Sequence, residues 1–118
     1  MKNQPLYKRL GFAWDGIKIS WQTEKSFRFH VAATSFVILL LLVTRPAPLW
    51  WAILLLTCGL VLALELVNTA VEKLVDHLHP DLHPAIKITK DALAGAVLIA
   101  SLIAVGVFAA FMGSLVGF

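Results

Sequence analysis

Charge is scarce in this sequence. Only 14% of its 118 residues are Asp, Glu, Lys or Arg, whereas 59% are hydrophobic and the mean hydropathy is +0.84. A soluble domain of this size needs a polar surface, and these residues are too few to make one. The composition therefore excludes an ordinary soluble domain and predicts a single integral-membrane domain over residues 1–118.

Several other features are missing. With one cysteine, Cys58, no intrachain disulfide can form. The sequence has no GxxxxGK[ST] loop for nucleotide phosphates, and its basic N-terminal part has no apolar core of the length that a signal peptide needs. The formal charge of +3 does not indicate a nucleic-acid partner, because the basic residues flank apolar segments, where anionic lipid attracts them.

The long apolar segments predict the fold class. Three of them are long enough to cross a membrane as helices. We expect these helices at residues 26–44, 49–76 and 90–117, the second with a cytoplasmic extension. Ahead of them, residues 5–22 carry apolar side chains at helical spacing, which predicts an amphipathic helix on the membrane surface. The expected fold is an all-α membrane protein with one surface helix and three transmembrane helices.

The positions of the basic residues predict the orientation of the chain. Of the ten Lys and Arg residues, only Arg45 lies in the loop between the first and second apolar segments. Basic residues favour the cytoplasmic side of a membrane. We therefore expect the N-terminus and residues 73–91 in the cytoplasm and the C-terminus outside.

A polar face interrupts the second apolar segment. It consists of Glu65, Asn68, Glu72 and Asp76. At about 100° per residue these side chains share one face of a helix. Glu65 falls inside the hydrocarbon near its cytoplasmic boundary, where an unpaired carboxylate is costly. We interpret it as functional; the alternative is a carboxyl group that only hydrogen-bonds to a neighbouring helix.

Further ionisable residues flank the apolar segments. If the three helices bundle, Glu24, Glu72 and Asp91 meet at one cytoplasmic level, and clustered carboxylates at a water boundary suit Mg²⁺ with substrate phosphates. Lys90 is a natural phosphate partner there. A zinc site is not favoured, because the three histidines of HLHPDLH (residues 77–83) are irregularly spaced and interrupted by proline. These patterns predict a cation-binding acidic cluster without naming a reaction.

A resemblance goes further than the patterns do. The run ELVNTAVEKLVD (residues 65–76) resembles the signature E-x-x-N-[ST]-A-x-E-x-x-x-D of the small prokaryotic lipid kinases, the diacylglycerol kinase and undecaprenol kinase family. WQTEKSFRFH precedes it and KDALAGAV comes after it in the same order. The resemblance implies an ATP- and Mg²⁺-dependent transfer of the γ-phosphate to a lipid hydroxyl. It also implies a homotrimer with sites between subunits, in a bacterial inner membrane.

The resemblance assigns roles to individual residues. Glu65 corresponds to the catalytic base and Asn68 to its supporting amide, while Glu24 and Glu72 correspond to metal and ATP-site carboxylates. Trp21 and Arg28, together with Glu65, correspond to lipid-substrate contacts. The remaining residues implied at the nucleotide site are Asp76, Asp81, His83, Lys90 and Asp91.

The chain departs from the enterobacterial diacylglycerol kinases at several positions. Where those enzymes carry Phe-Arg-Gln-Glu, it has FRFH at residues 27–30, and Pro5 and Phe12 stand where they use an arginine and a tyrosine. The FRFH run, together with HPAIKITKDALAGAV at residues 83–97, resembles the undecaprenol kinases more closely. This resemblance favours undecaprenol as the substrate, with diacylglycerol as the alternative. A small ion- or proton-translocating bundle with Glu65 as a relay is a more distant alternative, because no acid continues the path toward the outer side.

Overall fold

Four α-helices form the fold in the computed structural model, which describes residues 3–81 and 83–117. They are α1 (Leu6–Thr23), α2 (Lys25–Thr44), α3 (Pro48–Leu78) and α4 (Pro84–Leu115). Within the described ranges there is no strand. The all-α fold class is confirmed, and α2, α3 and α4 are each long and apolar enough to cross a membrane.

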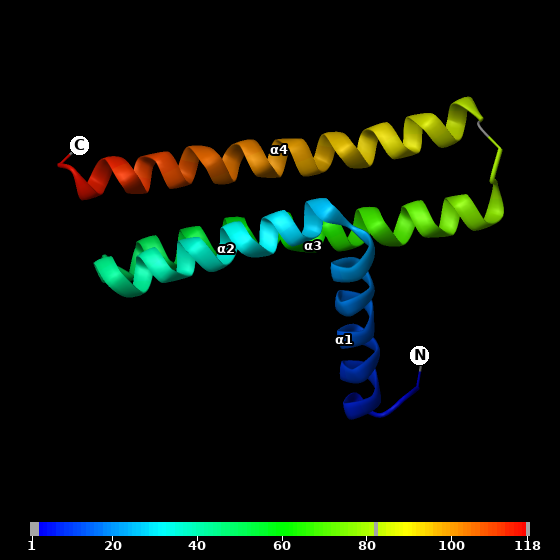
Figure 1. The fold of residues 1–118 in the computed structure, drawn as a ribbon, viewed down its shortest axis with the longest axis horizontal. Coiled ribbons are helices and arrows are strands. Elements are labelled where there is room, and N and C mark those ends of the chain that lie inside the picture. The colour runs from blue at the N-terminus through cyan, green and yellow to red at the C-terminus, as the bar shows by residue number, and fades with distance from the viewer. Residues whose placement is uncertain (1–2, 82, 118) are drawn as a thin grey trace.

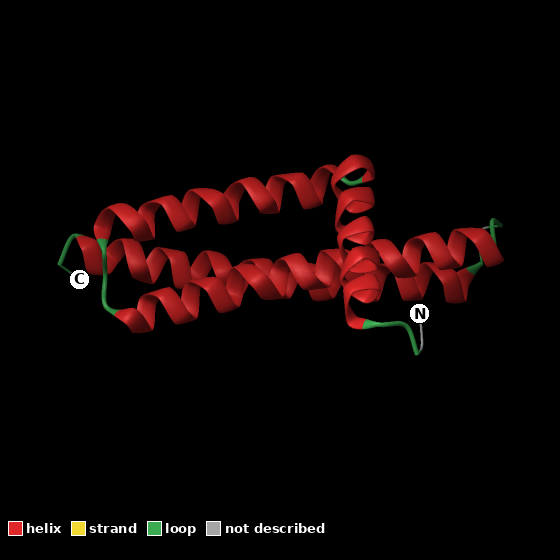
Figure 2. Ribbon diagram, turned by 90° about the horizontal axis from the view of Figure 1, so that it is seen from below, coloured by secondary structure: helices red, strands yellow, loops and turns green. Residues whose placement is uncertain are grey.

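The helix α3 is the centre of the arrangement. Figure 1 shows α2, α3 and α4 lying lengthwise together while α1 leaves crosswise, and α3 packs against each of the other three helices. The chain turns sharply between α1 and α2 at a corner part-way along α3. Beyond this corner only α3 and α4 continue (Figure 2). That end of α3 is therefore covered by fewer helices than the rest.

The lengths of the helices show that α2 matches the thickness of a membrane, whereas α3 and α4 are longer. At 1.5 Å per residue, the 20 residues of α2 are about 30 Å long, which matches a hydrocarbon core of roughly 30 Å. The 31 and 32 residues of α3 and α4 give about 46 to 48 Å. Both helices exceed the hydrocarbon core by about three turns.

Proline and backbone geometry set the turn between α2 and α3. Arg45 adopts a left-handed conformation, with φ 48° and ψ 57°, and its amide donates to the carbonyl of Leu41 at 2.9 Å. This is a common way for a helix to end. Pro48 then begins α3, where its missing N–H costs no helical hydrogen bond.

The start of α4 differs from the expected start at residue 90. The helix begins at Pro84, and the Nδ1 atom of His83 accepts a hydrogen bond from the amide of Ala85 at 3.0 Å. Proline is favoured at a first helical position, and a side-chain acceptor just before it caps the helix. The proline that directly follows the histidine run therefore starts a helix.

The best-packed core lies at the end of the bundle away from the α1–α2 corner. It consists of Val37, Leu41, Leu54 and Phe111, contributed by α2, α3 and α4. Around it Trp50 lies 5.5 Å from Phe111 between ring centroids, and Cys58 is half-buried as a small apolar residue. The outer faces of the helices carry exposed large apolar side chains. In lipid, close packing holds such helices together.

We expect Leu41→Ala to destabilise the fold far more than Leu42→Ala. Leu41 is 0% exposed, whereas its neighbour Leu42 is 57% exposed. Lipid tails are as apolar as leucine, so the loss comes mainly from the cavity and is on the order of 2 kcal/mol. Thermal unfolding in detergent micelles measures the difference, and equal melting temperatures for the two variants would contradict this description of the core.

Candidate active site

The polar face of α3 forms the floor of a cleft of about 450 Å³. Glu65, Asn68 and Glu72 line it from α3. Glu24 lines it from the α1–α2 corner and His30 from α2, while α4 contributes Ala94, Val97, Leu98 and Ser101. The structure therefore brings together the two proposed metal carboxylates, the proposed base and its neighbouring amide.

The Glu65 carboxyl group is almost fully buried. The residue is 4% exposed, and its Oε1 atom lies 3.4 Å from Nε2 of His30. His30 is a site residue that sequence reasoning missed. The signal was present, because His30 is the one residue with an ionisable side chain in the first apolar block, FHVAATSFVILLLLV, and Glu65 needs a polar partner at membrane depth.

Asn68 lies between Glu65 and Glu72 on the polar face and is hydrogen-bonded to Glu72. Its Nδ2 atom donates to Oε1 of Glu72 at 3.4 Å. Its Oδ1 atom is buried without a hydrogen-bond partner in the described part of the chain. Because buried polar atoms are nearly always hydrogen-bonded in folded proteins, this oxygen is an acceptor available to a bound molecule in the cleft.

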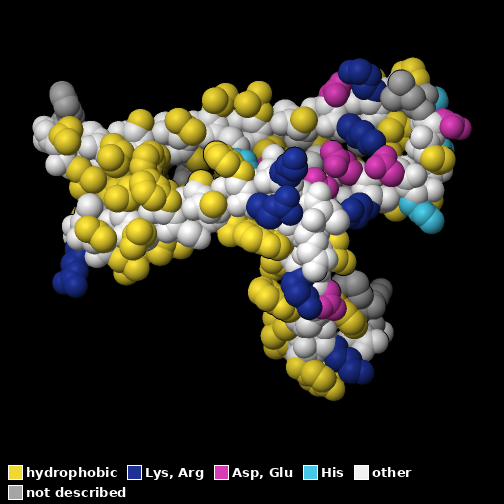
Figure 3. Space-filling model, viewed as in Figure 1, with side chains coloured by type: hydrophobic (Ala, Val, Ile, Leu, Met, Phe, Trp, Pro, Cys, Tyr) yellow, Lys and Arg dark blue, Asp and Glu magenta, His cyan; other side chains and the backbone are white. Residues whose placement is uncertain are grey.

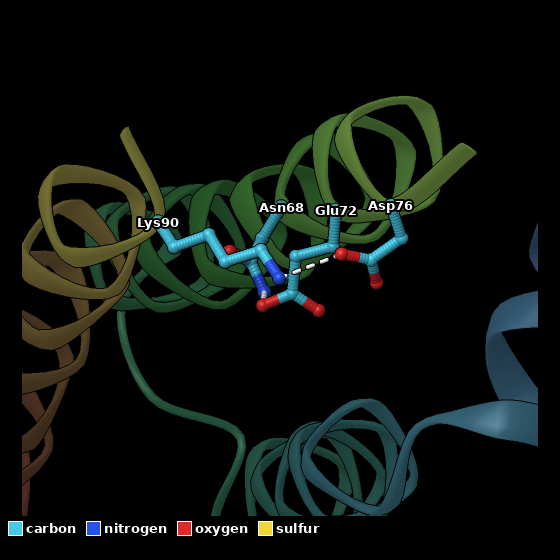
Figure 4. Close-up of polar contacts among 4 residues, drawn as sticks. All are labelled: Asn68, Glu72, Asp76 and Lys90. Atoms are coloured by element: carbon cyan, nitrogen blue, oxygen red, sulfur yellow. Dashed lines mark hydrogen bonds and ion pairs between the residues drawn. The ribbon is translucent and has the colours of Figure 1, made fainter. Parts of the chain in front are cut away.

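A charge pair joins α3 to α4 one helical turn beyond Glu72, and neither of its residues lines the cleft. Figure 4 shows Lys90 reaching from α4 toward the carboxylates of α3, where its Nζ atom donates to Oδ1 of Asp76 at 2.7 Å. The two side chains are 38% and 62% exposed, so water screens the pair and it adds little stability. Its effect is to hold the Lys90 ammonium group over the polar face.

Asp91 does not join the cleft, in contrast to the expected meeting of Glu24, Glu72 and Asp91. Its carboxylate pairs with Lys87 at 2.6 Å on the exposed surface of α4. Successive helical residues point about 100° apart, so when Lys90 faces α3 its neighbour turns away. Of the loop residues expected at the nucleotide site, Asp81 is exposed and His83 caps α4.

Arg28 fixes the corner between α1 and α2. Its guanidinium group donates to the backbone carbonyls of Trp21 at 2.8 Å and Gln22 at 3.3 Å. The Trp21 side chain itself is 46% exposed. The structure thus gives Arg28 a structural task that the sequence did not indicate, which is to hold the corner that carries Glu24.

An apolar groove adjoins the polar cleft. It measures about 260 Å³ and is lined by α2, α3 and α4, with Val37, Leu54 and Phe108 among its residues. His30 and Ser101 line both the groove and the cleft. The polar cleft is therefore continuous with a space suited to hydrocarbon.

Charged side chains gather at one end of the molecule. Figure 3 shows acidic and basic groups crowded over the α1–α2 corner and over the end of α3 and α4 near their connection. Further charged groups lie on α1, and a basic group lies at the opposite end of the bundle, whose face is otherwise mostly apolar. Among residues 3–81 and 83–117, no group of three or more His, Cys, Asp or Glu side chains could hold a metal ion. A divalent cation here would need ligands from a bound molecule as well.

Comparisons with known proteins decide the family. The model of the prokaryotic diacylglycerol kinase family matches residues 11–112. The chain belongs to this family. It is 37% identical over 94 residues to a diacylglycerol kinase of Helicobacter pylori strain J99, covering 80% of this chain and 73% of the other. It is also 37% identical over 97 residues to an undecaprenol kinase of Bacillus subtilis strain 168, covering 82% and 79%.

A more distant relative is a diacylglycerol kinase of Escherichia coli K12, which is 28% identical over 100 residues, covering 85% of this chain and 82% of the other. The family and the names of these relatives indicate a lipid kinase with ATP as its cosubstrate. The resemblance noted in the sequence is confirmed. Together with the three long apolar helices, the family makes this chain a membrane protein.

We expect Arg28→Ala to loosen the angle between α1 and the bundle, because it removes both hydrogen bonds that the guanidinium group makes at the corner. Spin labels attached to cysteines introduced by Lys18→Cys and Lys73→Cys, in a Cys58→Ser background, report the distance between α1 and α3. The distance distribution should broaden in Arg28→Ala and stay narrow in the control Lys25→Ala. Unchanged distributions in both would show that the corner does not depend on Arg28.

Proposed function

We propose that this chain transfers the γ-phosphate of ATP to the hydroxyl group of a membrane lipid at the cytoplasmic surface of a bacterial inner membrane. The observation that carries the proposal is the nearly buried Glu65 carboxyl group, which opens onto a polar cleft and contacts His30 where that cleft meets an apolar groove. A lipid hydroxyl stays at the interface and ATP stays in water. A base where the polar cleft meets the apolar groove therefore lies where the lipid hydroxyl and ATP can meet.

Glu65 is the proposed general base. It takes the proton of the lipid hydroxyl as that oxygen bonds to the γ-phosphorus, while the bond to the oxygen bridging the β- and γ-phosphates breaks and ADP leaves. Asn68 supports the geometry, since its amide donates to Glu72, and its Oδ1 atom, which has no partner within residues 3–81 and 83–117, can accept a hydrogen bond. Catalysis would rest mainly on positioning the two reactants.

Glu24 and Glu72 are the proposed Mg²⁺ ligands. Both line the cleft, and Mg²⁺ characteristically binds one or two carboxylates together with substrate phosphates, so these residues fit an ion that arrives with ATP. When bound, Mg²⁺ would neutralise negative charge on the phosphates. Lys90, held by Asp76 one helical turn beyond Glu72, would bind a phosphate oxygen.

The assembly and orientation are part of the same proposal. The N-terminus and the α3–α4 connection would lie in the cytoplasm, with α1 flat on the inner leaflet, where its exposed apolar side chains such as Leu10, Trp14 and Ile17 would meet lipid. In a homotrimer with sites between subunits, outward residues such as Asp91 would face a neighbouring cleft. The proposed nucleotide contacts then remain Asp76, Asp81, His83, Lys90 and Asp91.

Undecaprenol is the proposed lipid, with undecaprenyl phosphate as the product. Support comes from the FRFH sequence at residues 27–30 and from the similarity to the Bacillus subtilis enzyme. Diacylglycerol, which would give phosphatidic acid, is the second candidate. The equal identity to the Helicobacter pylori enzyme favours it.

We expect Glu65→Gln to abolish phosphorylation while leaving ATP binding largely intact. The amide keeps the size of the side chain but cannot accept the proton, and general-base catalysis contributes about 10² to 10⁴-fold to rates. Turnover and nucleotide binding on purified protein measure the two effects. Asp15→Asn, which neutralises an exposed acid on α1, is the control. Near-normal turnover of Glu65→Gln would show that Glu65 is not the general base.

A lipid panel tests the acceptor. Purified protein in mixed micelles with radiolabelled ATP and Mg²⁺ receives undecaprenol, a shorter polyprenol, diacylglycerol or a simple long-chain alcohol. We expect the highest kcat/KM for undecaprenol. A higher value for diacylglycerol would reverse the choice of lipid, and no labelled lipid with any acceptor would contradict the proposed reaction.

A further inference from the structure

His30 is the one polar contact of the Glu65 carboxylate in the described part of the chain. Its Nε2 atom lies 3.4 Å from Oε1, and neither a hydrogen bond nor a second ion pair involves this carboxylate in residues 3–81 and 83–117. The other polar group near Glu65, the hydroxyl of Thr69, donates to its backbone carbonyl instead. The polar contact of this carboxylate therefore comes from a side chain of another helix.

The surroundings restrict the imidazole more than a surface histidine would be restricted. The His30 side chain is 20% exposed, and the ring of Phe29 lies 5.5 Å away in an edge-on arrangement. His30 lies near the start of α2, next to the corner held by Arg28. The ring thus belongs to α2, while the carboxylate that it contacts belongs to α3.

The placement of His30 also marks the boundary between the two parts of the site. Of the residues lining the polar cleft, it is one of two that line the apolar groove as well. A lipid lying in the groove would present its hydroxyl end to the cleft beside this ring. The imidazole is therefore close to both the proposed base and the place where the acceptor oxygen would enter.

We infer that His30 is a positioning residue for the phosphoryl transfer, and this inference rests on the proposed role of Glu65 as the base. The Nε2 atom holds Oε1 of Glu65, which leaves the second carboxylate oxygen to accept the proton of the lipid hydroxyl. A glutamate side chain has several rotatable bonds, so without this contact the carboxylate samples orientations that do not face the acceptor. Holding one oxygen restricts that freedom before the lipid arrives.

Three substitutions separate this task from simple packing. His30→Gln keeps an N–H donor with enough reach to meet α3, His30→Asn keeps the same amide on a shorter side chain, and His30→Leu fills space without a donor. The measurements are kcat and the KM values for ATP and for the lipid alcohol, on purified protein in mixed micelles. His77→Leu, on the exposed end of α3, is the control for removing a histidine.

We expect His30→Leu and His30→Asn to lower kcat by roughly 100-fold, the size of loss that a misplaced catalytic group produces. KM for ATP should not change, since the nucleotide end of the cleft is untouched. His30→Gln should retain most of kcat, and His77→Leu should match the unmodified protein.

The outcomes distinguish this inference from the proposed function. If Glu65→Gln is inactive but His30→Leu has the kcat of the unmodified protein, the positioning role of His30 is wrong, whereas the role of Glu65 as the base is supported. If Glu65→Gln retains turnover, the base itself is wrong. If His30→Leu does not fold, the comparison of His30→Gln with His30→Asn decides: equal kcat values would overturn the inference, whereas a large loss confined to asparagine would support it.

Discussion

A carboxyl group enclosed by apolar helices is the constraint on which the rest of this structure depends. Glu65 is 4% exposed in the middle of a helix that is apolar enough to cross a membrane. A carboxylate at such a depth is costly unless polar groups meet it. In this chain the polar groups lie close by. His30 of α2 contacts the Glu65 carboxylate, and the polar cleft extends from Glu65 toward the charged end of the bundle.

The lengths of the helices create that cleft. Because α2 begins part-way along α3, the α1–α2 corner brings Glu24 beside the polar face, and the remaining turns of α3 have α4 alone beside them (Figures 1 and 2). The tight apolar core lies at the other end, where Leu41, Leu54 and Phe111 meet. Along α3 the molecule thus changes from packing core to apolar groove to charged cleft. A lipid kinase needs that order, since its acceptor is apolar and its donor is water-soluble.

Periodicity in the sequence is enough to predict the helices and the face shared by Glu65 and Glu72, but it cannot predict how the helices are rotated against one another. Asp91 was expected in the acidic cluster, yet the rotation of α4 that points Lys90 at Asp76 turns Asp91 outward. The contact between His30 and Glu65 depends on which turns of α2 and α3 lie level, and no spacing within one helix carries that information. The early start of α4 has a local cause, because proline breaks a helix in its interior but favours its first turn.

The central claim is that ATP and the lipid hydroxyl meet on the polar face of α3. It is tested most directly by an experimental structure in a lipid nanodisc with Mg²⁺ and a non-hydrolysable ATP analogue. The account predicts the terminal phosphate in the cleft between Glu65 and Lys90, with Glu24 and Glu72 beside the metal. A nucleotide bound on another face of the bundle, with Glu65 turned toward acyl chains, would contradict it.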